Sequence, residues 1–216
     1  MLRRQAFGRI AVPSGELTIG MRRKSFRARG GVLIMGDEAL RETPFQTKVV
    51  YDGRIISVEH WKVKLPDGRE AFREVVKHLG AAAVVPVDRD GYVTLVRQHR
   101  VAIDRMTWEI PAGKLNFAGE DPFEFAVREL EEETGLRAGR WELLTRVDTT
   151  PGFCTERIAL YLATDLTQHE AHADEDEFLM IRRIPLKEAA DQVMAGELAD
   201  AKTALGILMA FHRLHG

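Results

Sequence analysis

The sequence predicts a mixed α+β fold, and two observations lead to this expectation. Short apolar or alternating segments, which are typical of strands, recur between residues 45 and 184, and a sharply bounded helical pattern stands among them. Two further helical patterns close the chain, so strands and helices are mixed without strict alternation. The chain has 216 residues, 45% of them hydrophobic, and this composition suits one packed domain with a small appendage and excludes wholly disordered or collagen-like proteins.

The first 34 residues differ in composition from the rest of the chain. They contain eight basic side chains and a single acid, Glu16, although the whole chain has a net charge of only −2. Such an arm could bind nucleic acid or an anionic surface, could direct the protein to an organelle, or could be dispensable. Since Met35 offers a second start, the arm could also be an artefact of start assignment. We expect residues 1–44 to form a basic, flexible extension.

Residues 45–78 are expected to form a small antiparallel β-unit. A first strand ends at the turn Asp52-Gly53, and residues 55–63 alternate between apolar and polar. The segment Leu65-Pro66-Asp67-Gly68 is a strong hairpin turn that leads to a returning strand over 69–76.

Residues 79–216 are expected to form the main domain, in which helices flank a mixed sheet. The expected strands cover residues 80–87, 92–96, 108–110, 141–147, 158–163 and 178–184. An acid-rich loop is expected over 165–177, and helices are expected over 121–134, 186–195 and 200–215.

Three classes of protein are disfavoured by the composition. The chain has no run of 18 apolar residues, so no membrane-spanning segment is predicted. Its single cysteine, Cys154, excludes internal disulfides and a cysteine-rich zinc site, and it suits a reducing cytoplasm. The net charge of −2 creates no general attraction to nucleic acid. We therefore predict a cytoplasmic protein that requires neither a membrane nor nucleic acid.

The helix predicted over 121–134 has clear start and stop signals. Asp121 is a good N-cap, Pro122 fits the first helical position, and Gly135 is a good C-terminal stop. The helix is expected to bury an apolar stripe made of Phe123, Ala126, Val127 and Leu130.

The opposite face of this helix gathers three carboxylates. Glu132 and Glu133 lie three and four residues after Glu129, and like charges at this spacing destabilise a bare helix. Arg128 can pair with Glu132, which leaves Glu129 and Glu133 facing a place where a hard divalent cation such as Mg²⁺ would fit. The alternative is an ordinary solvated acidic face.

The residues around this helix resemble the Nudix box of the Nudix hydrolases. The resemblance is carried by Gly113, Glu120 and the run Arg128-Glu129-Leu130-x-Glu132-Glu133-x-Gly135-Leu136. One departure is that six residues, rather than the usual five, separate Gly113 from Glu120. The resemblance implies an α/β/α sandwich with a mixed sheet, and an activity that hydrolyses a nucleoside diphosphate linked to another group.

The same resemblance assigns roles to the box residues. It implies that Glu129 and Glu133 ligate Mg²⁺, or Mn²⁺, together with the backbone carbonyl of Ala112. Arg128 and Glu120 would hold the helix and the preceding loop together. Glu132 would be either a metal ligand or an orienting group.

Several further segments resemble the ADP-ribose pyrophosphatases within this family. These segments are Tyr51-x-Gly53-Arg54, Gln98-x-Arg100, the run from Trp108 to Gly113, Thr150-Pro151-Gly152-Phe153 and Asp200-Ala201-Lys202-Thr203. The resemblance implies Mg²⁺-dependent hydrolysis of ADP-ribose to AMP and ribose 5-phosphate by a homodimer that exchanges its N-terminal β-units. It places Arg54 and Arg73 at the adenosine end of the pocket, Arg100 near the phosphates or terminal ribose, and Gly152 and Glu156 at the substrate, with Glu156 near ribose hydroxyls.

The acid-rich loop is expected to supply the general base. By the same resemblance Glu175 would be the base and Glu177 a substrate-dependent metal ligand, with Asp174 or Asp176 as alternatives. Two other functions stay open: a broader pyrophosphatase for nucleoside-diphosphate sugars or oxidised nucleotides, and a non-catalytic regulator that senses ADP-ribose. The complete set of box carboxylates argues against a regulator without catalysis.

Overall fold

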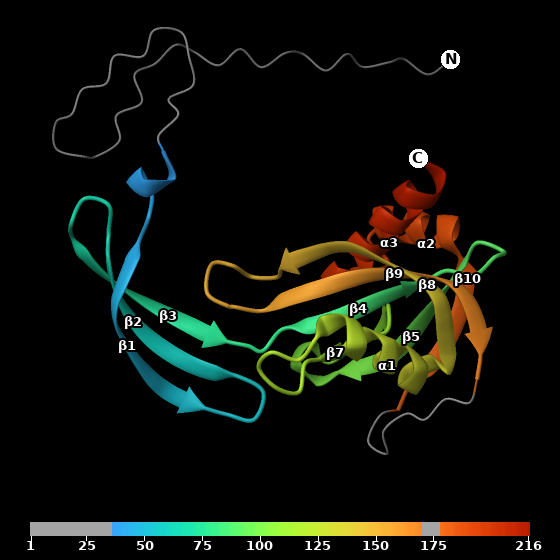
Figure 1. The fold of residues 1–216 in the computed structure, drawn as a ribbon, viewed down its shortest axis with the longest axis horizontal. Helices are drawn as coiled ribbons and strands as arrows, with labels where there is room; N and C mark the ends of the chain where they lie inside the picture. Colours follow the sequence, from blue (N-terminus) through green and yellow to red (C-terminus); the bar gives the residue numbers. More distant parts are fainter. Residues whose placement is uncertain (1–35, 170–177) are drawn as a thin grey trace, which may run out of the picture.

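The computed structural model describes residues 36–169 and 178–216, which form three sheets and three α-helices (Figure 1). The first sheet is antiparallel and contains β1 (Thr43–Asp52), β2 (Ser57–Lys64) and β3 (Glu70–Lys77) in that order. The three strands predicted here are confirmed, although β1 begins two residues earlier than expected. A short 3₁₀ helix, η1 (Asp37–Ala39), precedes them.

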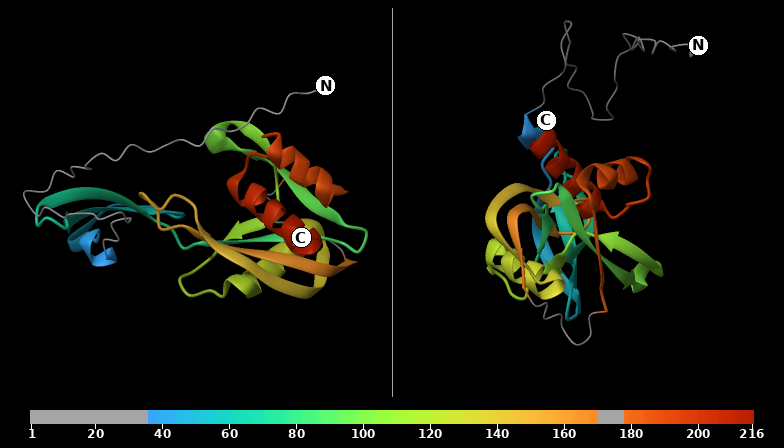
Figure 2. Two further views of the ribbon diagram at one scale, coloured as in Figure 1. Left: turned by 90° about the horizontal axis from the view of Figure 1, so that it is seen from above. Right: turned by 90° about the vertical axis from the view of Figure 1, so that its right-hand side faces the viewer.

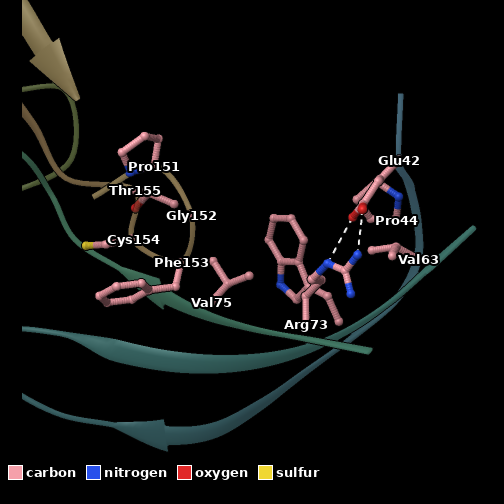
Figure 3. A pocket seen from close by; sticks show the side chains of 11 residues that line it. Glu42, Pro44, Val63, Arg73, Val75, Pro151, Gly152, Phe153, Cys154 and Thr155 are labelled. Carbon is pink, nitrogen blue, oxygen red and sulfur yellow. Dashed lines mark hydrogen bonds and ion pairs between the residues drawn. The ribbon is translucent and has the colours of Figure 1, made fainter. Parts of the chain in front are cut away.

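The first sheet projects from the main domain, and β3 is hydrogen-bonded to the loop between β8 and β9 (Figure 1). The backbone N–H of Val76 donates to the carbonyl of Phe153 at 2.7 Å, and the N–H of Thr155 donates to the carbonyl of Val76 at 2.9 Å. A pocket of about 280 Å³ lies at this junction, between Trp61 and Val75 of the sheet and Gly152 of the loop (Figure 3). The junction therefore joins the sheet to the main domain through backbone hydrogen bonds.

The main domain contains the other two sheets. One is mixed: β4 (Ala81–Pro86) pairs in parallel with β9 (Arg157–Gln168), while β7 (Ala112–Lys114) and β8 (Leu136–Asp148) add antiparallel strands in the order β7-β4-β9-β8. The other is antiparallel, in the order β10-β5-β6, with bounds Met180–Pro185, Tyr92–Arg100 and Arg105–Glu109. A second 3₁₀ helix, η2 (Val101–Ile103), links β5 to β6.

Helices cover both sides of these sheets, which confirms the predicted α/β/α arrangement (Figure 2). The helix α1 (Pro122–Thr134) lies on one side, and α2 (Leu186–Met194) and α3 (Ala201–His215) lie on the other. The central strand β4 serves both layers because successive side chains of a strand point to opposite faces. Ala82 and Val84 pack in the cluster that contains Leu130 of α1, whereas Ala83 and Val85 pack in the cluster that contains Ile207 of α3.

The apolar stripe predicted for α1 was partly wrong. Ala126 and Leu130 are buried, but Phe123 and Val127 are 38% and 37% exposed, and Phe125 is buried in their place. Phe123 instead makes an edge contact with the ring of Trp141, at a centroid distance of 5.5 Å. The helix is therefore rotated towards Phe125, and Phe123 covers the rim of the core.

The loop predicted from Asp165 was wrong for residues 165–168. These residues continue β9, because the long strand β8 begins at Leu136 and pairs with β9 as far as Gln168. The polar side chains here are compatible with a strand that is exposed at its end. In the part of the chain that the structure describes, no helix is long and apolar enough to cross a membrane.

Candidate active site

The helix α1 is held at both ends by the residues that predicted it. The side chain of Asp121 accepts a hydrogen bond from the N–H of Phe123 at 2.9 Å, and this contact caps the first turn. Gly135 ends the helix with a φ of 68°, a left-handed conformation that favours glycine. These two caps set the direction in which the carboxylates between them point.

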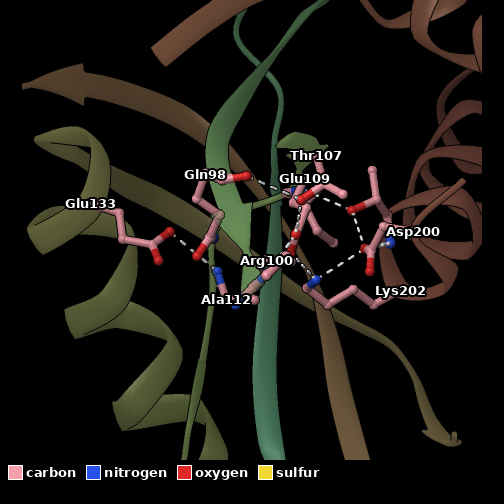
Figure 4. A network of polar contacts seen from close by, with 10 residues as sticks. Gln98, Arg100, Thr107, Glu109, Ala112, Glu133, Asp200 and Lys202 are labelled. Atoms are coloured by element: carbon pink, nitrogen blue, oxygen red, sulfur yellow. Dashed lines mark hydrogen bonds and ion pairs between the residues drawn. The ribbon is translucent and has the colours of Figure 1, made fainter. Parts of the chain in front are cut away.

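Glu129 and Glu133 both face the strand β7. Glu133 is only 4% exposed, and its Oε2 accepts a hydrogen bond from the N–H of Ala112 at 3.2 Å (Figure 4). The carboxylate of Glu129 lies against the backbone of Gly113, where an added Cβ would stand 2.5 Å from its Cδ atom. Gly113 is therefore needed for a close approach, since any side chain there would displace Glu129.

This pair of carboxylates fits a hard divalent cation in the chemistry of its donors. Two carboxylates converge on the backbone at Ala112 and Gly113, and Mg²⁺ and Mn²⁺ prefer oxygen ligands of this kind. Among residues 36–169 and 178–216, however, no group of three or more His, Cys, Asp or Glu side chains has the arrangement of a metal site. The predicted Glu175 and Glu177, with their alternatives Asp174 and Asp176, lie outside the described residues.

Arg128 ties α1 to the loop before it, as predicted. Its Nη2 lies 2.9 Å from Oε1 of Glu120, and its Nε lies 3.9 Å from Oε1 of Glu132. The N–H of Asn116 also donates to Glu120, at 2.6 Å. Burial raises the pKa of Glu120, but the hydrogen bonds from Asn116 and Arg128 outweigh it and lower that pKa below its ordinary value. Glu120 thus stays ionised and anchors the loop.

Arg100 lies beside the site in a partly buried polar network. It grips Glu109 with both Nε and Nη2, at 2.7 and 2.6 Å, and Lys202 and Thr107 contact the same carboxylate (Figure 4). Glu109 is 1% exposed. Burial raises its pKa, but the hydrogen bond from Arg100 and the charge of Lys202 prevail and lower the pKa to about 2.

Glu109 and Lys202 did not stand out in the sequence as single residues. Both belong to segments that resembled the ADP-ribose pyrophosphatases, and one general signal marks Glu109. An acid between the apolar residues Trp108 and Ile110 must be paired with a cation if it is buried.

The other predicted substrate residues lie around the N-terminal sheet. Arg73 forms an ion pair with Glu42, with 3.0 Å between Nε and Oε2, beside the pocket that Gly152 lines (Figure 3). Arg54 is exposed in the connection between β1 and β2. In the strand register, Arg73 of β3 lies opposite Trp61 of β2. Trp61 is four residues beyond Ser57, where β2 begins after this connection. Within one chain the two arginines are therefore not brought together.

Glu156 is held at the end of the loop that follows β8. It accepts a hydrogen bond from Oγ1 of Thr149 at 2.8 Å, and its Oε1 lies 3.7 Å from Nδ1 of His78. The side chain therefore points towards the junction between the first sheet and the main domain rather than towards open solvent.

The chain is similar to known proteins of one family. The NUDIX domain model matches residues 77–204, which is more than half of the chain. The ADP-ribose pyrophosphatase of Mycobacterium tuberculosis is 39% identical over 175 residues, which cover 78% of this chain and 84% of that protein. The ADP-ribose pyrophosphatase of Bacillus subtilis is 39% identical over 172 residues, covering 79% and 92%. A crystal structure of an ADP compounds hydrolase has the same fold, with a TM-score of 0.71 at 23% identity, and covers 81% of this chain and 95% of that one.

Proposed function

Because the chain belongs to the Nudix hydrolase family, we propose that it hydrolyses the diphosphate of ADP-ribose to AMP and ribose 5-phosphate with the help of Mg²⁺. Nudix hydrolases generally need a divalent metal. The observation that carries the proposal is the convergence of Glu129 and Glu133 on Ala112 and Gly113. The names of the two relatives at 39% identity support ADP-ribose as the substrate.

The metal would be held by residues that this chain presents together. We assign the ligands to the carboxylates of Glu129 and Glu133 and the backbone carbonyl of Ala112, and we keep Mn²⁺ as an alternative ion. A divalent cation bound there would neutralise the diphosphate and activate water for its attack on phosphorus. Arg128 would hold α1 in place through Glu120, and Glu132 would serve either as a metal ligand or as an orienting group.

The base for this attack is assigned to Glu175 and a substrate-dependent metal ligand to Glu177, with Asp174 or Asp176 as alternatives for either role. General-base catalysis needs a carboxylate within hydrogen-bond reach of the attacking water, and loops that close on a substrate can supply one. In an extended segment, residues two apart point the same way, so both carboxylates could serve one site.

Five residues are assigned to the substrate: Arg54, Arg73, Arg100, Gly152 and Glu156. The guanidinium of Arg100 suits anionic oxygens, and its side chain remains 41% exposed although it is paired with Glu109. The pocket beside Arg73 and Gly152 supports placing the adenosine end there. Glu156, a carboxylate at the same junction, can accept hydrogen bonds from ribose hydroxyls.

A homodimer with exchanged N-terminal β-units completes the proposal. Every residue of β1 is exposed, and the large apolar side chains of Phe45, Val49, Tyr51 and Phe72 are each more than half exposed. The strand register puts Val49 on one face of this sheet and Tyr51 and Phe72 on the other, so apolar side chains are exposed on both faces, and a two-fold exchange would cover part of them. The single cysteine supports a cytoplasmic location, and the function requires neither a membrane nor nucleic acid.

The experiment is to incubate the protein with ADP-ribose and Mg²⁺ and to measure AMP by chromatography, with a chelator as the control. We expect AMP and ribose 5-phosphate in equal amounts, and no AMP when the metal is removed. GDP-mannose, tested in parallel, would reveal a broader pyrophosphatase. Binding of ADP-ribose without any AMP would contradict the enzyme and indicate a sensor.

A further inference from the structure

The N-terminus of α3 is fastened to the strand that leads into the candidate metal site. Asp200 caps α3, and its Oδ2 accepts hydrogen bonds from the N–H of Thr203 at 3.0 Å and from the Thr203 hydroxyl at 2.5 Å. The Thr203 hydroxyl in turn accepts the N–H of Ile110 at 3.0 Å. Thr203 is fully buried, so the N–H of Ile110 has no access to water that could replace this contact.

A second link joins the neighbouring residues of the same two segments. The ammonium of Lys202 contacts the carboxylate of Glu109, and it lies 3.0 Å from Oδ2 of Asp200 (Figure 4). Lys202 and Glu109 are almost completely buried, with side-chain exposures of 10% and 2%. Two consecutive residues of α3 therefore hold Glu109, the last residue of β6, and Ile110, which follows it.

Residues 109 and 110, which contact α3, are followed directly by Pro111 and by Ala112, whose backbone N–H contacts Glu133. The carbonyl of Pro111 accepts the N–H of Val84 at 2.9 Å, and the N–H of Ala112 donates to Glu133 at 3.2 Å. Helix α3 also packs closely here, since a Cβ added at Gly206 would stand 3.1 Å from Cδ1 of Ile110. A shift at the start of α3 would therefore be transmitted along residues 109–112 to the contact with Glu133.

We propose that Thr203 and Lys202 are positioning residues that set the place of Ala112 against Glu133 and so determine the affinity of the site for a divalent cation. This inference rests on the proposed function, because it assumes that Glu133 and Ala112 hold the metal. It goes beyond that function by assigning a role in metal binding to the start of α3, a helix that contributes no ligand. A purely structural role would lower the stability of the protein and leave its metal affinity unchanged.

The test is a titration of the full-length protein with Mn²⁺, followed by the electron paramagnetic resonance signal of the free ion. Thr203→Val keeps the size of the side chain and removes the hydroxyl, and we expect Mn²⁺ to bind about 10-fold more weakly, at the lower end of the range for groups that support metal ligands. Thr203→Ser retains the hydroxyl and should bind Mn²⁺ as the wild type does. Ile207→Val is the matched control, because Ile207 is a buried residue one turn further along α3 whose side chain is wholly apolar.

Equal Mn²⁺ affinity in Thr203→Val and the wild type would overturn the inference and leave the proposed function standing. Weaker binding in Ile207→Val, to the same extent as in Thr203→Val, would also overturn it, because general loosening would then be the cause. If Thr203→Val does not fold, Lys202→Met decides: weaker binding by several fold supports the inference, and unchanged binding overturns it. Failure of the wild type to bind Mn²⁺ would refute the metal site of the proposed function, and the inference with it.

Discussion

Replacing Gly113 by alanine should damage the site while leaving the fold intact. The added Cβ would stand 2.5 Å from Cδ and Oε1 of Glu129 and 2.7 Å from Oε2, whereas ordinary van der Waals contact begins at 3.4 Å. The obstacle is the end of a flexible side chain, so the carboxylate rather than the backbone should yield, by about 0.9 Å. Because a misplacement of about 1 Å can lower turnover about 100-fold, we expect a loss of that order in Mg²⁺-dependent kcat.

The assay for Gly113→Ala compares AMP release with the free energy of unfolding in urea. We expect a change in stability of less than about 1 kcal/mol, since few other contacts are disturbed. Gly36→Ala is the control, because nothing lies within 4 Å of a Cβ at that position, and it should match the wild type in both measurements. Wild-type turnover in Gly113→Ala would refute the placement of Glu129 in the site, and a large loss of stability would refute the claim that the side chain gives way.

Three further predictions concern other parts of the chain. The pKa of Glu109 is about 2 in the folded protein against 4.5 as its ordinary value, so its contribution of about 3 kcal/mol should be complete above pH 4.5 and disappear as the pH falls towards 2. The free energy of unfolding in urea should accordingly change less with pH between 5 and 3 in Glu109→Gln than in the wild type. An equal change with pH in both proteins would contradict this account. Glu175→Gln should lower kcat roughly 10²- to 10⁴-fold with little change in KM, and near wild-type turnover would place the base elsewhere. Sedimentation should give twice the 24.4 kDa of one chain, and a protein that starts at Met35 should likewise give twice the mass of its own shorter chain, whereas a monomer at micromolar concentration would exclude the exchanged dimer.

The local part of the site could be predicted from the sequence because its signals are local. Asp121 and Gly135 delimit α1, and within those limits the spacing of Glu129 and Glu133 determines that they share a face. The contact between Arg128 and Glu120 crosses only one loop, and it was also predicted correctly. These features depend on helix geometry and hardly at all on the rest of the fold.

Features that depend on distant neighbours could not be predicted in the same way. Phe123 and Phe125 are equally apolar, and the difference between them follows from distant residues, since Phe123 contacts the rings of Trp141 and Tyr161 at the rim of the core. Glu109 and Lys202 are 93 residues apart, so their pairing follows from the docking of α3 on the sheet rather than from any short pattern. The extension of β9 to Gln168 depends on backbone pairing with the start of β8 at Leu136, because three of its last four side chains are polar.

The measurement that tests the central claim most directly is Mg²⁺-dependent AMP release from ADP-ribose by Glu133→Gln and Glu131→Gln. Both variants remove one charge from α1, but Glu133 faces Ala112, whereas Glu131 pairs with Arg137 at 2.5 Å. We predict that Glu133→Gln folds normally and loses most of its turnover, and that Glu131→Gln stays within a few-fold of the wild type. Turnover by Glu133→Gln within a few-fold of the wild type would contradict a metal site at Glu129, Glu133 and Ala112.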